Sequence, residues 1–305
     1  MSPVSRRVGV LLCGLSAVAF ALLGPFGVPA FATGASVNTV IGWRFLLAAV
    51  AVWVIVAATR RPVGRGREVW QPLVMGAALY ATQSALYFLA LQRLTVGLTS
   101  LLLYTMPVMV VVASVATRRE RASVRVGIAL LLAVGGVAVT LLGPGVGAVS
   151  VVGVLLGLAS AVVYTIYYFG MDTLPATVDR VSVTALICSG AAVAHIVVGN
   201  LRGVFDWTPS RDLLGWIVAM ASVSTVLAMM LLLTGIRGAG AASASVVSCI
   251  EPITAVLIGA ALFGDPFGPA QWLGTAGVVA AVALLARRPA PYTVVAEPES
   301  LAPLR

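Results

Sequence analysis

Apolar residues run through this chain in ten long stretches, and polar residues are concentrated in the short segments between them. Each stretch is close to the length of about 20 residues that a helix needs to cross the hydrocarbon core of a bilayer. The pattern therefore predicts an all-α integral membrane protein with ten transmembrane helices. The predicted spans are Val8–Phe31, Ser36–Thr59, Trp70–Leu91, Thr95–Thr117, Val124–Leu142, Val149–Gly170, Val181–Asn200, Asp212–Thr234, Gly240–Phe263 and Ala270–Ala286.

The same spacing between a proline and an acidic residue occurs twice along the chain. Pro107 precedes Glu120 by the same distance that separates Pro252 from Asp265, and the two pairs are offset by 145 residues. Internal repetition in a membrane protein points first to a transporter. Residues 8–142 and 149–288 are therefore predicted to be two repeats of five helices each.

A second match supports the duplication and gives its geometry. The segment GVLLCGLSAVAF from Gly9 aligns without a gap with GVLLGLASAVVY from Gly153. Because five helices are an odd number, the second repeat must begin on the opposite side of the membrane from the first. The sequence thus predicts inverted repeats, which allow two similar conformations to open a central site to alternate sides.

The composition excludes a soluble protein. Hydrophobic residues make up 60% of the chain and charged residues 10%, with a mean hydropathy of +1.07, far from the balance of a soluble domain. The net charge of +9 would suit a nucleic-acid partner only if the basic residues shared a soluble face, and no soluble domain is predicted. No nucleic-acid partner is therefore expected.

The positions of the arginines predict the orientation. All basic residues are arginines, and most lie before the first span or after an even-numbered span. Loops rich in basic residues stay in the cytoplasm. Both termini are therefore predicted to be cytoplasmic, with residues 1–7 as a short N-terminus and 289–305 as a disordered tail. The first stretch also resembles a secretory signal that ends at Ala30-Phe31-Ala32, but its partner in the second repeat favours its retention as a span.

Few residues could support catalysis or bind a metal. The chain has one histidine and three isolated cysteines, without the paired spacing of a metal site. An integral membrane enzyme would need convergent catalytic groups. We therefore expect no enzyme activity, no metal and no cofactor.

Three ionisable residues fall within predicted spans, where a charge is costly and often functional. Glu251 directly precedes Pro252, whose ring removes a backbone donor; the carboxyl either takes part in proton or substrate binding or satisfies the freed backbone. Arg44 either binds a substrate carboxylate or extends toward the membrane surface. His195 is expected to be a satisfied histidine rather than a site residue.

Polar residues also form stripes at helical spacing. A polar stripe in a membrane helix turns toward partner helices or a wet cavity, and tyrosines and a glutamine near mid-span favour the cavity, with interhelical hydrogen bonding as the alternative. Together with Arg44 and Glu251, the stripes give the predicted substrate site: Tyr80, Gln83, Ser84, Tyr87, Ser100, Tyr104, Ser160, Tyr164, Tyr167 and Ser248. Kinks at Pro107 and Pro252 are predicted to let their helices act as gates.

Several of these segments resemble the EamA family of the drug/metabolite transporter superfamily. The resemblance rests on Gly24-Pro25-Phe26, Arg44 in WRF, LYFLALQRLTVGLTSLLLYTMPV, SCIEPITAV and QWLGTAGVV, and it covers about Val8 to Arg288. Two departures are Val28, where many similar sequences carry a lysine, and Asp265, where glutamate is usual. The resemblance implies an inner-membrane permease for small metabolites, often amino acids.

Together these features lead us to expect a multi-pass secondary transporter of the cell membrane. It is expected to move an amino acid or related solute, with export favoured, by alternating access. A broad-specificity drug efflux permease is the nearest alternative, and a channel or scaffold is the alternative from another class. The expected partners are the small-molecule substrate and membrane lipid, with protons and a homodimer left open.

Overall fold

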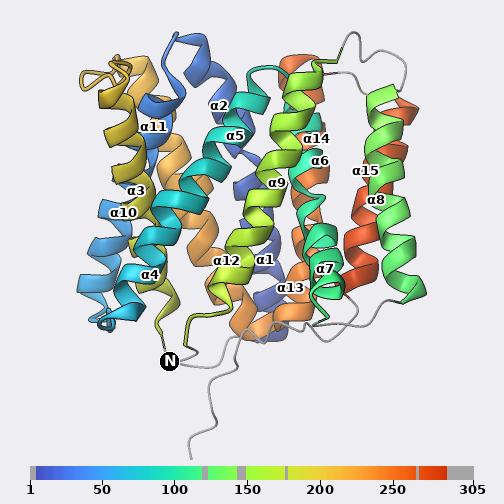
Figure 1. Ribbon diagram of the computed structural model, residues 1–305, viewed down its shortest axis with the longest axis horizontal. Coiled ribbons are helices and arrows are strands. Elements are labelled where there is room, and N and C mark those ends of the chain that lie inside the picture. The colour runs from blue at the N-terminus through green and yellow to red at the C-terminus, as the bar shows by residue number, and fades with distance from the viewer. Residues whose placement is uncertain (1–4, 119–122, 143–148, 176–177, 266–267, 287–305) are drawn as a thin grey trace, which may run out of the picture.

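The computed structural model describes residues 5–118, 123–142, 149–175, 178–265 and 268–286, and their secondary structure consists of helices joined by short loops (Figure 1). Most of these helices run between two ends of one bundle. We call the end where α1 begins the lower end, and the opposite one the upper end. The helices are α1 Arg6–Ala21, α2 Leu23–Ala32, α3 Val37–Ala58, α4 Arg67–Met75, η1 Gly76–Tyr80, α5 Ala81–Leu91, α6 Val96–Leu103, α7 Met106–Ala116, α8 Val124–Leu142, α9 Val151–Met171, α10 Arg180–Leu201, α11 Arg211–Ala221, η2 Ser222–Leu227, α12 Ala228–Ala239, α13 Ala241–Ser248, α14 Ile250–Phe263 and α15 Pro269–Ala286, where η1 and η2 are π-helices.

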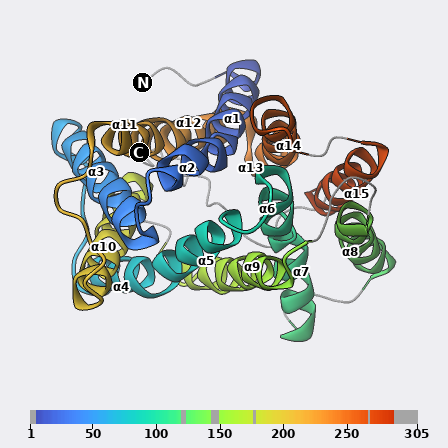
Figure 2. The same cartoon turned by 90° about the horizontal axis from the view of Figure 1, so that it is seen from above.

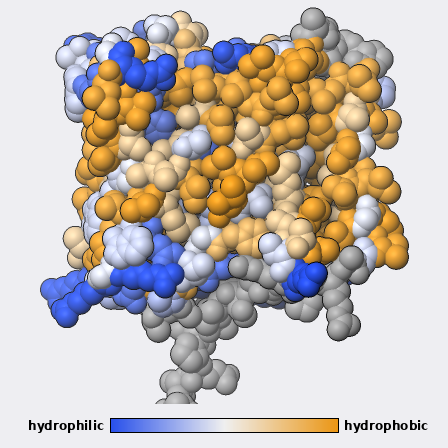
Figure 3. Space-filling model, in the orientation of Figure 1, coloured by the Kyte–Doolittle hydropathy of each residue, from blue (hydrophilic) through white to orange (hydrophobic). Residues whose placement is uncertain are grey.

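Eight helical segments in the described residues are long and apolar enough to cross a membrane. They match the first eight predicted spans. The other two predicted spans correspond to α13 with α14, and to α15, which are apolar but shorter. Hydrophobic residues cover most of the middle of the visible face, and hydrophilic residues gather toward its edges (Figure 3). The prediction of an all-helical protein with many apolar helices is confirmed.

Five of the predicted spans contain local breaks that hydrophobicity does not reveal, and one of them is the eighth, which contains the π-helix η2. The first divides at Leu22 into α1 and α2. The fourth divides between α6 and α7, just before Pro107, and the ninth divides between α13 and α14, just before Glu251 and Pro252. A proline lacks the N–H that would continue the helical ladder and clashes with the carbonyl four residues earlier. The third span contains η1, a π-helix of the kind often found at functional sites.

The helices pack in pairs. Viewed from above, α1 with α12 and α5 with α9 form two opposite sides, α3 with α10 closes one end, and α8 with α15 stands at the other (Figure 2). Between these, α6 packs against α14. Glycines allow the closest approach: a Cβ on Gly76 or Gly190 would collide with the backbone of the facing helix. Such contacts between small residues are the usual basis of helix association in lipid.

Local structures recur at an offset of 144 or 145 residues. The π-helix η1 corresponds to η2, and the break after α6 corresponds to the break after α13. A pair of hydrogen bonds repeats in the same way. The Ser16 hydroxyl donates to the Ala228 carbonyl (2.7 Å), and the Ser160 hydroxyl donates to the Gln83 carbonyl (3.1 Å). Each bond joins one half of the chain to the other, with the roles of the halves exchanged.

Candidate functional site

Six tyrosines lie around the centre of the bundle. The chain has seven tyrosines in all, and the seventh is in the tail, outside the described residues. Tyr80, at the end of η1, packs against Tyr164 and Tyr167 of α9, with ring centroids 6.3 and 5.3 Å apart. Phe45 of α3 covers another side of Tyr80 at 5.4 Å. The predicted tyrosine faces of the third and sixth spans are therefore brought together.

Glu251 lies beside these tyrosines, at the first turn of α14. The hydroxyl of Tyr104, at the end of α6, is 2.9 Å from Glu251 Oε2 and 2.7 Å from the Ser248 carbonyl oxygen. That carbonyl is four residues before Pro252, so it has no helical N–H donor. Tyr104 thus satisfies the backbone group that the proline leaves free. Tyr80, Tyr87, Tyr164 and Tyr168 also lie near Glu251.

Arg44 lies inside the bundle rather than at its surface. Its side chain is only 3% exposed, and its Nε donates to the Thr225 hydroxyl (3.0 Å). The guanidinium carbon lies 4.7 Å from the ring centroid of Phe45 and 5.9 Å from that of Phe88, within the range of cation–π attraction. Nη1 is buried with no hydrogen-bond partner among the described residues. The buried guanidinium therefore retains an unused donor, which favours an anionic group as its ligand.

The π-helix η2 explains how Thr225 reaches Arg44. Its hydroxyl donates to the Met220 carbonyl five residues earlier (3.0 Å), a spacing that belongs to the wider π turn. Its oxygen then faces α3. Tyr80 occupies the corresponding position of η1, and it also interacts electrostatically with Arg44. Each π-helix thus turns a polar side chain toward the same cation.

Other predicted site residues form hydrogen bonds between or within helices. Gln83 Nε2 donates to the Ser160 hydroxyl (3.1 Å), and the Ser84 hydroxyl donates to Gln83 Oε1 (3.4 Å). Tyr87 and Ser100 share a hydrogen bond of 3.4 Å. These contacts connect α5 with α9 and α5 with α6. They agree with the alternative prediction that the polar stripes form hydrogen bonds between helices. The Ser248 hydroxyl donates within its own helix, to Ala244 O.

His195 has partners on both ring nitrogens. Nδ1 is 3.1 Å from Asn38 Oδ1, and Nε2 is 3.2 Å from the carbonyl oxygen of Ala81. The ring is buried and lies parallel to Phe45. His195 therefore joins α10 to α3 and α5, as expected of a satisfied histidine.

Two residues near Arg44 were not predicted, namely Phe88 and Thr225. Phe88 stands in a continuous apolar stretch, and no periodic signal separates it from ordinary packing residues. Thr225 reaches the site only because η2 changes the helical phase. No group of three histidine, cysteine or acidic side chains placed to hold a metal occurs in the part of the chain that the structure describes.

The chain matches a transporter family in sequence and a solved protein in fold. The model of the EamA-like transporter family matches it twice, at residues 7–142 and 151–287. The curated protein "Uncharacterized transporter YcbK" of Bacillus subtilis (strain 168) is 25% identical over 264 residues, covering 82% of this chain and 83% of that protein. A solved crystal structure, titled only as that of a protein, superposes with a TM-score of 0.68 at 19% identity, covering 92% of this chain and 99% of the other.

Proposed function

Because the chain belongs to the EamA-like transporter family, we propose that this multi-pass membrane protein is a secondary transporter that exports an amino acid or a similar small solute from the cell. The observation that carries the proposal is the group of tyrosines that lies near both a buried arginine, Arg44, and a carboxyl group, Glu251. The proposed mechanism is alternating access between two inverted repeats of five helices, with both termini in the cytoplasm.

The exchanged hydrogen bonds support the inverted arrangement. The Ser16 hydroxyl donates to the Ala228 carbonyl as the Ser160 hydroxyl donates to the Gln83 carbonyl. In each case, the first span of one half is hydrogen-bonded to the third span of the other half. A twofold axis in the membrane plane would relate the two contacts. The arginines support the orientation, because those in the described loops at the lower end outnumber those at the upper end.

Alternating access is supported by an unequal pair of contacts. At the upper end, α6 packs against α14, and a Cβ on Gly97 would lie 3.0 Å from Val256 Cγ2. The offset of 145 relates this contact to one between α13 and α7 at the lower end. No comparable packing joins α13 and α7 in the described chain. A transporter closed at its upper end and open at its lower end has this arrangement, and exchange of the two contacts would reverse it.

The charges support a zwitterionic solute. Tyr80 and Tyr87 each lie near both Arg44 and Glu251. The two ionisable side chains are therefore close to the same tyrosines. In this proposal, Arg44 binds the carboxylate through its unused Nη1, and Glu251 binds the amine. The mechanism places no metal or cofactor between them.

Hydrogen-bond counting supports a role for protons at Glu251. The Tyr104 hydroxyl has one hydrogen, and the Ser248 carbonyl can only accept. If that hydrogen is donated to Ser248, the contact between Tyr104 and Glu251 requires a proton on the carboxyl group. Release of this proton would break the contact between α6 and α14 at mid-membrane. A proton can thus control the same two helices that form the upper closure.

Transport by purified protein in liposomes tests the function. Vesicles are loaded with labelled amino acids in one series and with cationic dyes in another. We expect saturable flux and counterflow for one or more amino acids. Flux of dyes alone would support the drug-efflux alternative, which the aromatic side chains also suit. Flux that neither saturates nor shows counterflow would support a channel and overturn the proposal.

Replacement of Glu251 by glutamine tests the proton role in the same vesicles. The amide keeps the hydrogen-bonding shape but cannot ionise. We expect transport to lose its dependence on pH and on an imposed proton gradient. Unchanged rate and pH dependence would remove protons from the mechanism without affecting the assignment as a transporter.

Paired cysteines test alternating access directly. The native cysteines are buried and are replaced first. The pair Leu98→Cys and Val256→Cys joins α6 to α14, and the offset of 145 gives its counterpart, Val111→Cys and Ser243→Cys, between α7 and α13. We expect both pairs to cross-link, each to block transport, and substrate to change their rates in opposite directions. Failure of the lower pair to cross-link under any condition would contradict the exchange of contacts.

A further inference from the structure

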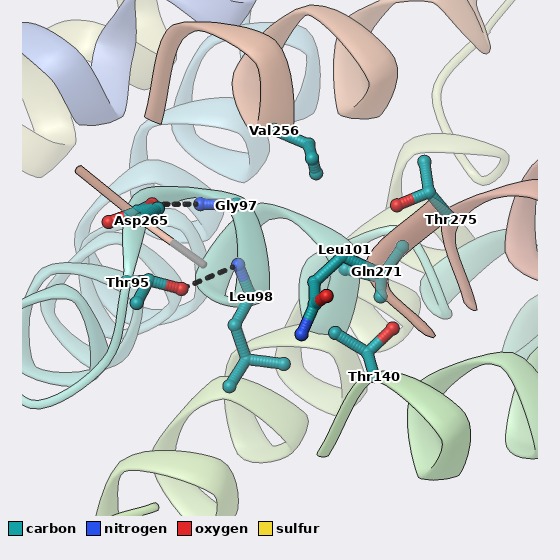
Figure 4. Close-up of a pocket in the computed structure, with 9 residues that line it drawn as sticks. All are labelled: Thr95, Gly97, Leu98, Leu101, Thr140, Val256, Asp265, Gln271 and Thr275. Atoms are coloured by element: carbon teal, nitrogen blue, oxygen red, sulfur yellow. Dashed lines mark hydrogen bonds between the residues drawn. The ribbon is translucent and has the colours of Figure 1, made fainter. Parts of the chain in front are cut away.

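A small cavity lies at the upper end, away from the central tyrosines. It has a volume of about 20 Å³ and is lined by α6, α8, α14, α15 and the loop before α15 (Figure 4). Its polar side chains are those of Thr95, Thr140, Asp265, Gln271 and Thr275. A cavity of this size holds about one water molecule, provided that polar groups face it.

Asp265 lies at the beginning of α6. Its Oδ2 accepts a hydrogen bond from the Gly97 backbone N–H (3.3 Å), next to the cap in which the Thr95 hydroxyl oxygen accepts from the N–H of Leu98 (3.2 Å). The free N–H groups of a helix N-terminus favour a carboxylate. Asp265 therefore links the loop between α14 and α15 to the start of α6, where Gly97 packs against Val256 of α14.

Two buried polar groups in the cavity have no partner. The side chains of Gln271 and Thr275 are 5% and 3% exposed, and Gln271 Nε2 and Thr275 Oγ1 make no hydrogen bond within the described chain. Gln271 Oε1 accepts from the Gly268 N–H (2.8 Å), which leaves Nε2 as the unused end. An unpaired amide donor requires an acceptor, so water fits this cavity better than a cation does.

No cation faces the Asp265 carboxyl among the described residues. Among the described residues that line the cavity, Asp265 alone has a titratable side chain. Glu251 of α14 lies far below, beside Tyr104. Arg93, in the preceding loop, is exposed and donates to the Leu89 carbonyl (2.8 Å). Burial raises the pKa of Asp265, and the N–H groups of Gly97 and Val96 act in the opposite direction.

We propose that Asp265 and this cavity form a second proton-binding site, hydrated by one water molecule, that controls the opening of the upper end. In the closed arrangement the N–H groups of Gly97 and Val96 favour the ionised carboxyl, but partial desolvation without an ionic partner is the larger effect and favours the protonated form. The ionised form is better hydrated when α6 and α14 separate. By linkage, low pH therefore stabilises the closed upper end, and high pH favours its opening. The inference rests on the proposed function only in treating this contact as a gate.

Labelling of a buried cysteine in the cavity tests the site without any transport measurement. Val256→Cys is introduced into a background without the native cysteines, and the protein is placed in nanodiscs that expose both ends. The rate of reaction with a small polar thiol reagent is measured between about pH 4 and pH 7, the range above the ordinary pKa of an aspartate. The same measurement with Asp265→Asn provides the ratio that removes the intrinsic pH dependence of the thiol.

We expect the labelling rate with Asp265, relative to Asp265→Asn, to rise with pH by roughly tenfold, the change that one unit of pKa difference between two states produces. Asp265→Glu should keep this rise, which separates loss of the acid from loss of folding. Asp206→Asn, at an exposed acid of the same end, should behave as the parent. A ratio that stays constant with pH, or an equal effect of Asp206→Asn, would overturn the inference while leaving the transport proposal intact.

Discussion

The two halves of the molecule share features of their backbone but differ in their buried ionisable residues. Both have a π-helix in the third span and a proline-associated break in the fourth, at positions 145 residues apart. Arg44, however, corresponds to Ser189, and Glu251 corresponds to Met106. Ser189 accepts a hydrogen bond from Trp53 Nε1 (3.0 Å), an ordinary interhelical contact. Shape and flexibility are thus duplicated, whereas each ionisable group at the centre occurs once.

This difference suggests a division of labour. A motion that opens alternate ends requires equivalent hinges in both halves, and these are the features that repeat. A substrate with unlike ends requires unlike partners, and these are the features that do not repeat. Substitutions at paired positions should therefore affect transport unequally when they remove charge.

The largest effect is expected from Arg44→Gln. It removes the buried cation and its unused Nη1 while keeping a polar side chain near Thr225. Loss of a buried charged contact to a substrate carboxylate costs about 3 kcal/mol, or roughly a hundredfold in transport rate at low substrate concentration. Initial rates of uptake in liposomes measure this.

Ser189→Ala, at the paired position, serves as the control and should change the rate less than twofold, since a single neutral hydrogen bond contributes about 1 kcal/mol mainly to stability. Equal losses in the two variants would show that Arg44 acts through packing. Arg44→Lys should keep part of the rate, because lysine retains the positive charge but lacks the planar guanidinium group that can donate two parallel hydrogen bonds.

The sequence predicted the main features of the fold because its signals are local. Apolar length, the two prolines and the tyrosine stripes all lie within single helices, and eight long apolar helices with the breaks near Pro107 and Pro252 match them. The tyrosine faces of the third and sixth spans also pack against each other, and their role as a substrate site stays a prediction. The sequence left two alternatives for the polar stripes, a cavity or hydrogen bonds between helices, and the contact between Gln83 and Ser160 agrees with the second. It also left two alternatives for Arg44, which is buried rather than extended toward the membrane surface.

Other features could not be predicted, because they depend on distant contacts or on small changes of helical phase. The π-helices insert one residue per turn without any change in hydrophobicity, so Thr225 gave no signal. Phe88 is one of many apolar residues until Arg44 lies beside it. The cavity beside Asp265 joins four helices, and the unpaired Nε2 of Gln271 depends on how these helices pack, which the mainly apolar stretch around Gln271 does not reveal. Glu120, the acid paired with Asp265 in the sequence, lies outside the described residues.

Gly9 and Gly153 provide a second paired comparison, with a smaller effect on stability. A Cβ on Gly9 would lie 2.7 Å from the backbone carbon of Gly238 and 2.8 Å from the carbonyl oxygen of Gly235. Backbone atoms of a packed helix cannot move aside, so Gly9→Ala should destabilise the protein by about 2 kcal/mol. Thermal unfolding in detergent, followed by circular dichroism, measures the difference.

Gly153→Ala is the matched change in the other half. Its Cβ would meet side-chain atoms of Arg93 and Leu94, at 3.0 and 2.8 Å, and these belong to a loop that can shift. Alanine also favours the helix by about 1 kcal/mol over glycine. We therefore expect a change close to zero. A loss as large as that of Gly9→Ala would show that both helix pairs are equally rigid and that the halves differ less than their contacts indicate.

The smallest effect on transport rate is expected from Tyr104→Phe. This change tests the break between α13 and α14 in the second half, where the Tyr104 hydroxyl donates to the Ser248 carbonyl. The change leaves the Ser248 carbonyl without its donor and removes the contact with Glu251. One hydrogen bond of this kind contributes about 1 kcal/mol, so the rate should fall only about fivefold, the factor to which that energy corresponds. The informative result is the pH profile, which should shift because Glu251 loses its hydrogen-bond partner. Tyr168→Phe is the control, because it removes the hydroxyl of a tyrosine that is 41% exposed and whose ring packs against Tyr164. If both variants lower the rate equally and neither moves the profile, Tyr104 supports the helix break alone and Glu251 titrates independently of it.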